Sequence, residues 1–162
     1  MYFQYFPLTL YTLDDGTTVK VVTNIFLRNV INDDIKNNLS LFDEYDIIDG
    51  ETPEIVSQKF YRTPNLHWLI LHYNDIIDPR FDWPLSTYNL IKYCESKYTN
   101  INAAHHYINS DGYIVNSTEI GATSVSNYTF EEELNENKRR IKVLKTNYVD
   151  TLVREFIKKI SE

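Results

Sequence analysis

The sequence predicts an α+β fold: a small mixed domain built from β-hairpins and short helices. Three observations support this class. Two segments suited to strands each surround an Asp-Gly turn signal, at residues 14–16 and 110–112. Two helix starts of the form Thr-Pro follow one another, at residues 52–53 and 63–64. Residues 147–160 place apolar side chains at helical spacing.

The N-terminal part of the sequence predicts a hairpin and a connecting segment. Residues 8–22 read LTLYTLDDGTTVKVV, in which Asp-Gly divides two stretches rich in β-branched residues. Residues 24–35 have irregular apolar spacing, so we expect a short helix or an irregular segment there. The pair Asn37-Asn38 then predicts a turn. Residues 41–49 alternate well enough to form a strand that ends at an Asp-Gly turn.

Two short helices are expected back to back after that strand. Thr52 is suited to cap the first helix, and Pro53 fits its first turn because the N–H that proline lacks is not needed there. We expect one buried face on this helix, formed by Ile55, Val56 and Phe60.

The second helix repeats the start signal at Thr63. Its apolar side chains have the i, i+3, i+4, i+7 spacing of one buried face: Leu66, Leu69, Ile70 and Tyr73. An Asn-Asp pair ends the helix. Residues 79–84, PRFDWP, then predict an aromatic loop between two prolines.

Ser86 is suited to cap a further helix. The side chains expected to point inward from it are Leu90, Ile91, Cys94 and Tyr98. Residues 104–116 predict a second hairpin, and the small polar residues of 121–127 predict a loop.

The C-terminal part begins with a helix signal at Thr129, since Glu132 follows at the spacing of a capping box. Residues 139–144 alternate like a strand, and residues 147–160 predict an amphipathic helix. The inward side chains of that last helix are Val149, Leu152, Phe156 and Ile160. The predicted organisation has three regions: an N-terminal hairpin with a connecting segment (1–40), a central region (41–86), and a helix, hairpin and strand-helix region (87–162).

Composition excludes several classes of protein. A chain of 162 residues can bury about 70% of its extended surface. Its net charge of −7 disfavours binding to nucleic acid or to anionic lipid, because phosphates would be repelled. The aromatic start lacks the pattern of a signal peptide, and no apolar run is long enough to span a membrane. The single Cys94 cannot form an internal disulfide, so we expect it in the core and expect synthesis in a reducing interior.

The sequence shows no pattern typical of catalysis, and we expect no cofactor and no metal. His67 and His72 lie about 140° apart around a helix and cannot converge on one ion. His105 and His106 are adjacent in a predicted strand and should point to opposite faces. Paired acids occur in turns or at helix starts, where capping explains them. The sequence contains no nucleophile motif and no phosphate-binding glycine loop, and it has only four glycines from which such a loop could be built.

The two tryptophans leave two interpretations open. Trp68 lies off the main apolar face of its helix, and Trp83 lies in the loop between two prolines. Both could cover the core. Alternatively, one or both anchor a partner, since Trp and Tyr are favoured at interfaces, and part of the Trp68 ring should then stay available at the surface.

The central region resembles the LysM module, a βααβ unit best known for binding peptidoglycan and chitin. The resemblance rests on the strand with its Tyr, the two short helices and the Asn after them: YDIIDGETPEIVSQKFY and HYNDIIDP. The sequence that follows, RFDWPLS, does not have the usual G-x-x-L-x-I-P ending of that unit.

A second resemblance spans nearly the whole chain. The start MYFQYF, the segment VVTNIFLRNV, the core GETPEIVSQKFYRTPNLHWLILHYNDIIDPRFDWP and the C-terminal NENKRRIKVLKTNYVDTLVREF are similar to the baseplate wedge protein, with a LysM-like fold, of T-even-like contractile-tailed phages. The most specific parts are P-N-L-H-W-L-I-L-x-x-N-D and N-E-N-K-R-R-I-K.

This resemblance implies a structural, non-enzymatic protein of the virion tail baseplate, made in the host cytoplasm. Its expected partners are other baseplate wedge proteins and hub-proximal tail proteins, with multiple copies joined into a six-fold ring around the tail hub. The residues that we expect at such interfaces are Trp68, Trp83, Tyr73, Phe156 and Ile160.

Two alternatives stay open from sequence alone: a glycan-binding LysM module and a cell-wall hydrolase. A glycan binder would more often carry repeated modules on Ser/Thr/Pro-rich linkers, and a hydrolase would need a second domain with a recognisable acid pair. The sequence shows neither feature.

Overall fold

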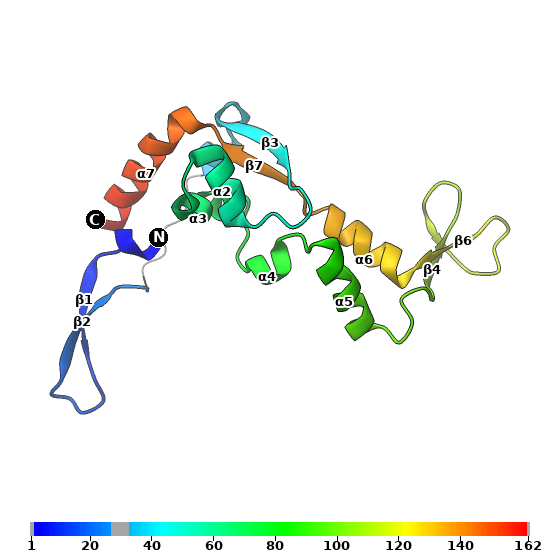
Figure 1. The fold of residues 1–162 in the computed structure, drawn as a ribbon, viewed down its shortest axis with the longest axis horizontal. Helices are drawn as coiled ribbons and strands as arrows, with labels where there is room; N and C mark the ends of the chain where they lie inside the picture. Colours follow the sequence, from blue (N-terminus) through cyan, green and yellow to red (C-terminus); the bar gives the residue numbers. More distant parts are fainter. Residues whose placement is uncertain (1, 27–32, 162) are drawn as a thin grey trace. The chain divides into compact units, whose positions relative to one another are not determined.

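The computed structural model describes residues 2–26 and 33–161, and it confirms the predicted α+β class (Figure 1). The strands are β1 (Leu8–Thr12), β2 (Val19–Thr23), β3 (Phe42–Asp46), β4 (Ala104–Ile108), β5 (Ile114–Val115), β6 (Thr123–Ser126) and β7 (Arg140–Leu144). The α-helices are α1 (Asp33–Asn37), α2 (Pro53–Tyr61), α3 (His67–Tyr73), α4 (Pro79–Asp82), α5 (Thr87–Lys97), α6 (Asn127–Glu136) and α7 (Thr146–Ser161). The 3-10 helices are η1 (Tyr2–Tyr5), η2 (Leu39–Leu41) and η3 (Pro64–Leu66).

The chain forms two compact units. Unit 1 comprises Met1–Glu44, Thr52–Ile77 and Lys142–Glu162, and unit 2 comprises Tyr45–Glu51 and Asp78–Ile141. Unit 1 is therefore assembled from three separate stretches of sequence, whereas most of unit 2 is one continuous stretch. In the described part of the chain, no helix combines the length and the apolar character that a membrane span requires.

The core of unit 1 is formed by side chains from α2, α3 and β7. Its fully buried hydrophobic members are Val56, Leu69, Ile70, Val143 and Leu144. The predicted inward positions of the second helix are confirmed for Leu69, Ile70 and Tyr73, which are all buried on α3.

Both Thr-Pro helix starts are confirmed. Thr52 Oγ1 accepts a hydrogen bond from Ile55 N at 3.4 Å, and Thr63 Oγ1 accepts one from Asn65 N at 3.3 Å. Between the two helices, Ser57 Oγ donates to Thr63 O at 2.7 Å, which ties α2 to the start of the next helix. The first turn after Thr63 is the 3-10 helix η3, which continues into α3.

The buried face of α2 differs from the predicted one. Ile55 is 49% exposed, and the buried residues of the helix are Pro53, Val56, Ser57 and Tyr61. This set includes a polar residue, Ser57, whose hydroxyl bonds to a backbone carbonyl and can therefore be buried without penalty. An apolar pattern alone cannot identify such a position, so the predicted face was rotated toward Ile55.

Strand β3 pairs with β7, which lies near the other end of the chain. Lys145 N donates to Leu41 O, and Ile47 N donates to Arg139 O, both at 2.9 Å. The residue before β3 thus bonds to the residue after β7, and the residue after β3 bonds to the residue before β7. The two strands therefore run antiparallel. The order strand, helix, helix, strand arises from β3, α2, α3 and β7, with residues 74–139 between the second helix and the second strand. The LysM-like character of this order stays a prediction.

In each unit, one asparagine side chain bonds to both backbone groups of a residue far away in the sequence. In unit 1, Asn74 Nδ2 donates to Lys142 O at 2.7 Å and Oδ1 accepts from Lys142 N at 2.8 Å. In unit 2, the buried Asn135 makes the same pair of bonds with Leu85, at 2.9 Å to O and 2.7 Å from N. Each amide satisfies both backbone groups of one residue.

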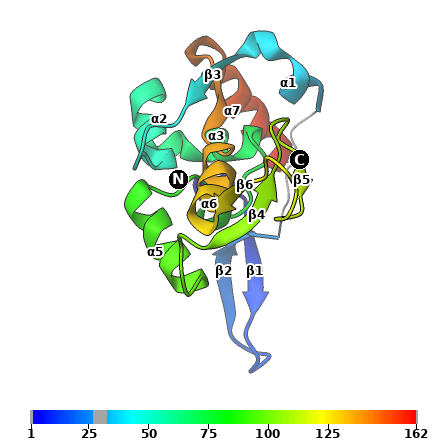
Figure 2. The ribbon, with the colours of Figure 1, turned by 90° about the vertical axis from the view of Figure 1, so that its right-hand side faces the viewer.

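The N-terminal hairpin is confirmed, with β1 and β2 side by side (Figure 2). The antiparallel register runs from Leu8 opposite Thr23 to Thr12 opposite Val19. At the tip, Asp15 Oδ1 accepts from the backbone N of residues 17 and 18, at 3.0 and 2.8 Å. Gly16 has a φ of 68°, in the left-handed region that favours glycine.

Part of the predicted connecting segment, residues 27–32, lies outside the described residues. The segment ends in the helix α1, and Asn38 then caps η2 through a side-chain bond from Ser40 N at 3.2 Å. The Asn-Asn pair at residues 37–38 therefore marks a change between helices, as the predicted turn implied.

Helix α5 of unit 2 begins at the predicted cap. Ser86 Oγ accepts from Asn89 N at 3.4 Å. Leu90 and Cys94 are buried as predicted, but Ile91 is 37% exposed. The buried stripe of this helix is thus narrower than the apolar pattern suggested.

Three predicted boundaries in unit 2 are wrong. The loop at 79–84 contains the short helix α4, which begins where Asp78 accepts a hydrogen bond from Arg80 N at 3.0 Å. The loop at 121–127 contains strand β6, which pairs with β4. Helix α6 is capped by Ser126 rather than Thr129: Ser126 Oγ accepts from Thr129 N at 3.0 Å, so Thr129 already lies inside the helix.

The second predicted hairpin is confirmed as β4 and β5, and β6 completes a three-stranded sheet in the order β5-β4-β6. The pairing of β4 with β6 shifts between Ala104 and His106. This irregularity explains why His105 and His106 do not point to opposite faces: their Nδ1 atoms lie 2.9 Å apart. A bulge places neighbouring side chains on one side of a strand, which strict alternation forbids.

Candidate protein interface

Two of the predicted interface residues, Trp68 and Phe156, lie together in an aromatic cluster of unit 1. Trp68 comes from α3 and Phe156 from α7, and their ring centroids are 4.5 Å apart. Two rings from the N-terminal segment join them: Tyr5 lies 6.1 Å from Trp68, and Phe6 lies 6.4 Å from Phe156. The cluster attaches the residues that immediately precede β1 to the helices of unit 1.

Tyr73 and Ile160 are also buried within unit 1, at 7% and 5% exposure. The Tyr73 ring lies 5.1 Å from that of Phe42. Burial, with a smaller contribution from the charge of Glu155, raises the pKa of Tyr73 to about 12, so its hydroxyl stays protonated at neutral pH. Both residues therefore act as core residues of the isolated chain.

Trp83 belongs to unit 2, where its indole Nε1 donates to Glu51 O at 2.7 Å. The hydrogen bond satisfies the one polar atom of the indole, and the residue is 6% exposed. Trp83 thus fixes the loop after α4 to the segment that precedes α2.

The expectation that part of the Trp68 ring stays available is wrong, because Trp68 is only 5% exposed, and Trp83 is buried as well, at 6% exposure. Trp68 is covered by residues distant in sequence, Tyr5 and Phe156, which no pattern within its own helix could reveal. A role for these buried rings in contacts with other proteins stays a prediction.

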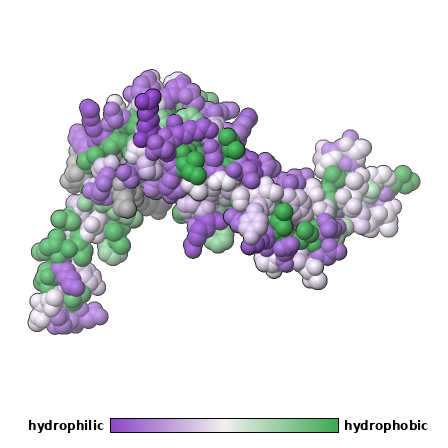
Figure 3. Space-filling model, viewed as in Figure 1, coloured by the Kyte–Doolittle hydropathy of each residue, from purple (hydrophilic) through white to green (hydrophobic). Residues whose placement is uncertain are grey.

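The structure instead exposes an apolar face on the N-terminal hairpin. Directly opposed residues of an antiparallel pair share one face, and alternate residues along a strand do so as well. Leu8, Leu10, Val19 and Val21 therefore lie on the same face, which we call the Leu/Val face. Their exposed fractions are 69%, 71%, 54% and 64%. Figure 3 shows hydrophobic residues gathered over this hairpin.

The opposite face of the hairpin has a different character. It pairs Tyr11 with Lys20 and Thr9 with Val22, so polar groups alternate with apolar ones. Tyr11 is 50% exposed and Val22 37%. The Leu/Val face is the more apolar of the two, because its polar residues, Thr12 and Thr23, lie only at its ends, opposite Val19 and Leu8.

Such a face is suited to contact with another protein. A two-stranded hairpin is at best marginally stable alone, and a contiguous exposed apolar patch typically marks an interaction site. From Leu8 to Asn24 each residue is exposed or half-buried within the chain. Among the residues that the structure describes, each of the two strands also keeps one unpaired edge, because their sheet has the order β1-β2.

The hairpin itself is predictable from the sequence, whereas its character as a candidate interface is visible only in the structure. A signal was present: LTLYT and VKVV place their leucines and valines on one face once the strands pair around Asp-Gly. Residue type alone made the tryptophans candidates for an interface. The better indicator is an apolar strand face that the described residues leave exposed.

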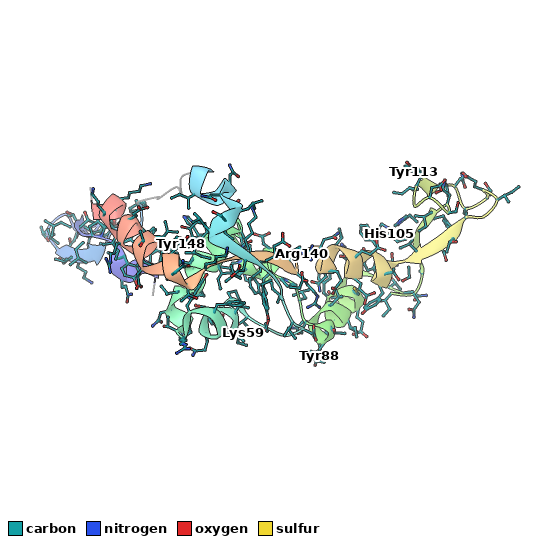
Figure 4. All side chains as sticks on the ribbon, turned by 90° about the horizontal axis from the view of Figure 1, so that it is seen from above. Lys59, Tyr88, His105, Tyr113, Arg140 and Tyr148 are labelled. Atoms are coloured by element: carbon teal, nitrogen blue, oxygen red, sulfur yellow. The ribbon has the colours of Figure 1, made fainter. Side chains whose placement is uncertain are left out.

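The histidines take part in local contacts. His67 Nδ1 lies 2.8 Å from Pro64 O, and His105 stacks on Phe130 with ring centroids 3.9 Å apart, where β4 meets α6 (Figure 4). Within residues 2–26 and 33–161, no cluster of three or more His, Cys, Asp or Glu side chains is placed to hold a metal ion.

Comparison with known proteins assigns the chain to a family. No curated protein matches the sequence. The family model described as base plate wedge protein 53 matches residues 1–119, a stretch that includes the Leu/Val face, α2 and α3. Members of such a family are structural parts of the phage tail baseplate and contact other baseplate proteins. The chain belongs to the base plate wedge protein 53 family.

Proposed function

We propose that this protein joins neighbouring baseplate wedges into the ring around the tail hub, and that its Leu/Val face packs against an adjacent baseplate protein. The observation that carries this proposal is the exposure of Leu8, Leu10, Val19 and Val21 on one face of a hairpin that the described residues leave uncovered. The membership of the base plate wedge family supplies the setting.

The energetics favour occupation of this face. Burial of a Leu or Val side chain contributes about 1.5–3 kcal/mol, and the four side chains of the face keep more than half of their surface exposed. The aromatic cluster at Tyr5 and Phe6 holds the base of the hairpin, which lowers the ordering cost when a partner binds. A contact through a held hairpin is therefore more favourable than one through a loose terminus.

The wider proposal retains the role inferred from sequence. The protein is a non-enzymatic structural component, made in the host cytoplasm and present in multiple copies in a six-fold ring, with wedge and hub-proximal tail proteins as partners. Nucleic acid and membrane are not among its partners. The net charge of −7 supports this last point, because it disfavours contact with phosphate-rich surfaces.

The test is complementation of a phage that lacks this protein with Leu10→Asp and with Val21→Asp. These two residues face one another across the hairpin, and a charge on either one should cost about 2 kcal/mol or more in association. Electron microscopy of the lysates should show separate wedges in place of closed rings.

The matched control is Tyr11→Asp, which introduces the same charge on the opposite face, beside Lys20. Circular dichroism should show that all three variants are folded. Closed rings in normal number with both Leu10→Asp and Val21→Asp would remove the Leu/Val face from the assembly.

A further inference from the structure

Unit 2 carries a groove of about 430 Å³ between α4, α5 and α6. The residues that line it and are used below are Arg80, Phe81, Tyr93, Lys97, Leu134 and Lys138. All of them belong to the continuous part of unit 2, so the groove is formed within that unit.

The walls of the groove offer large apolar surfaces to solvent. Phe81 is 69% exposed, Leu134 44% and Tyr93 41%. These three residues come from α4, α6 and α5 respectively, so each helix contributes one apolar side chain. A groove with apolar walls between helices is a common binding place for a segment of another protein.

The charge of the groove is opposite to that of the protein. Arg80, Lys97 and Lys138 line it, while the net charge of the chain is −7. Glu131 is the one carboxylate in the lining, and it is already engaged by Lys97 Nζ at 2.7 Å and by Tyr98 Oη at 2.6 Å. Both bonds fall on Oε1, and the Glu131 side chain is only 6% exposed, so Lys97 already balances its charge and little of it faces a partner.

Lys138 is the cation best placed to meet a ligand. Its Nζ donates to Phe81 O at 2.7 Å, and no carboxylate in the described part of the chain bonds to it. Arg80, by comparison, forms a two-point contact with Asp78, at 3.0 and 2.7 Å. The groove thus combines apolar walls with an ammonium group whose charge is not neutralised.

We propose that this groove binds a segment of another protein in which a large apolar side chain lies beside a carboxylate. The apolar side chain would pack among Phe81, Tyr93 and Leu134, and the carboxylate would accept a charge-assisted hydrogen bond from Lys138. This surface lies on unit 2 and is separate from the Leu/Val face of unit 1. The protein would then have two contact surfaces of different chemistry.

A protein segment suits the groove better than a nucleic acid or a glycan does. Nucleic acid would meet the strongly negative net charge of the rest of the chain. A neutral glycan would leave the charge of Lys138 without a partner. A segment with both an apolar and an acidic side chain satisfies both features of the groove.

The test uses a library of random twelve-residue peptides selected on the immobilised full-length protein. The enriched peptides should share an Asp or Glu close to a Leu, Phe or Trp. The tightest of them, synthesised with a fluorescent label, should bind in solution, and its Kd should rise at least about tenfold with Lys138→Glu, the loss expected for one charge-assisted hydrogen bond. Leu134→Asp should weaken binding similarly.

The matched control is Lys92→Glu, since Lys92 lies on α5 outside the groove, over the ring of Tyr88 at 4.4 Å. Tyr88 itself projects from α5 away from α6 (Figure 4). This variant should leave the Kd unchanged, as should Leu10→Asp on the Leu/Val face, so failure of one surface is distinguishable from failure of the other. A peptide whose carboxylate is replaced by Lys should regain affinity for Lys138→Glu.

Two results would overturn the proposal. The first is an enriched set without carboxylates, or peptides whose Kd does not respond to Lys138→Glu. The second is binding of a chitin hexasaccharide or a labelled DNA oligonucleotide that is lost with the groove variants, while no peptide binds.

Discussion

Replacement of Asn135 by Leu tests how one side chain holds unit 2 together. Asn135 is 3% exposed, and its amide bonds to both backbone groups of Leu85. Leu has nearly the shape of Asn but offers neither a donor nor an acceptor. The substitution therefore leaves the N–H and the carbonyl of Leu85 without their partners.

The expected loss follows from those two groups. A buried backbone group left unsatisfied costs about 1–3 kcal/mol. Leu85 is half-buried, so water can reach part of this backbone and the lower half of the range applies to each group. Asn135→Leu should thus lower the free energy of unfolding of unit 2 by about 2–4 kcal/mol.

Each unit contains one buried tryptophan, Trp68 in unit 1 and Trp83 in unit 2. The fluorescence of each tryptophan can therefore follow the unfolding of its own unit. Urea titrations followed by fluorescence should be made with Asn135→Leu in two backgrounds, Trp68→Phe and Trp83→Phe, each compared with its own parent. The transition reported by Trp83 should move to lower urea. Asn74→Leu, which removes the equivalent bonds to Lys142, should move the transition reported by Trp68.

The control is Asn137→Leu, an exposed position at the end of α6, which should change the free energy of unfolding by less than about 0.5 kcal/mol. If Asn135→Leu lowers the Trp83-reported stability by less than about 1 kcal/mol, then water or a rearranged backbone replaces the amide, and Asn135 does not hold unit 2 together through Leu85.

Three further predictions concern the core and the buried acid. Leu69→Ala should lower the free energy of unfolding by about 2–5 kcal/mol because Leu69 is 1% exposed, whereas Ile77→Ala, at 88% exposure, should have little effect in the same urea titration. Trp68→Ala should cost about 3–5 kcal/mol and increase hydrogen exchange in residues 3–24, since the ring supports Tyr5; a variant as stable as wild type would contradict its core role. Burial alone would raise the pKa of Glu131, but hydrogen bonds from Lys97 and Tyr98 outweigh it and hold that pKa below its ordinary value. The stabilisation by Glu131 is then present above the unfolded pKa and lost as pH falls through the lower folded one, so the stability difference from Glu131→Gln should shrink in acid; a difference that stays constant from pH 7 to about pH 3 would refute this linkage.

The elements that the sequence predicted well are those whose signals are local. Thr52, Thr63 and Ser86 were identified as caps because a cap bonds to a backbone N–H two or three residues ahead. The hairpin at Gly16 was equally predictable, since its turn needs a left-handed residue at that place. In each case the determining partner lies within a few residues.

Two of the predictions that failed depend on partners far along the chain. Trp68 is covered by Phe156 and Tyr5, and strand β6 exists because it pairs with β4. The prediction of a cap at Thr129 was wrong for a different reason. Ser126, three residues earlier, is also suited to cap a helix, and the spacing of a capping box does not decide between the two residues.

The candidate site could be predicted only in part. Residue type pointed to the tryptophans, but their burial shows that a large ring is as useful to a core as to an interface. The alternation in LTLYT was visible, yet the absence of a covering element over Leu8 and Leu10 is a property of the folded chain. The groove of unit 2 joins Phe81 to Lys138, 57 positions later, and had no sequence signal.

The division of unit 1 into three stretches has a consequence for the order of events during synthesis. Strand β3 leaves the ribosome early, but its partner β7 follows only after the whole of residues 78–139 has been made. Unit 2 is mostly continuous, and its own bonds from Lys138 to Phe81 and from Asn135 to Leu85 bring its two ends together. A nascent chain that folds unit 2 first would shorten the loop that separates β3 from β7 and reduce the entropy cost of pairing them. Unit 2 would then act as an internal folding aid, so that slow codons placed after residue 141 should raise the yield of soluble protein.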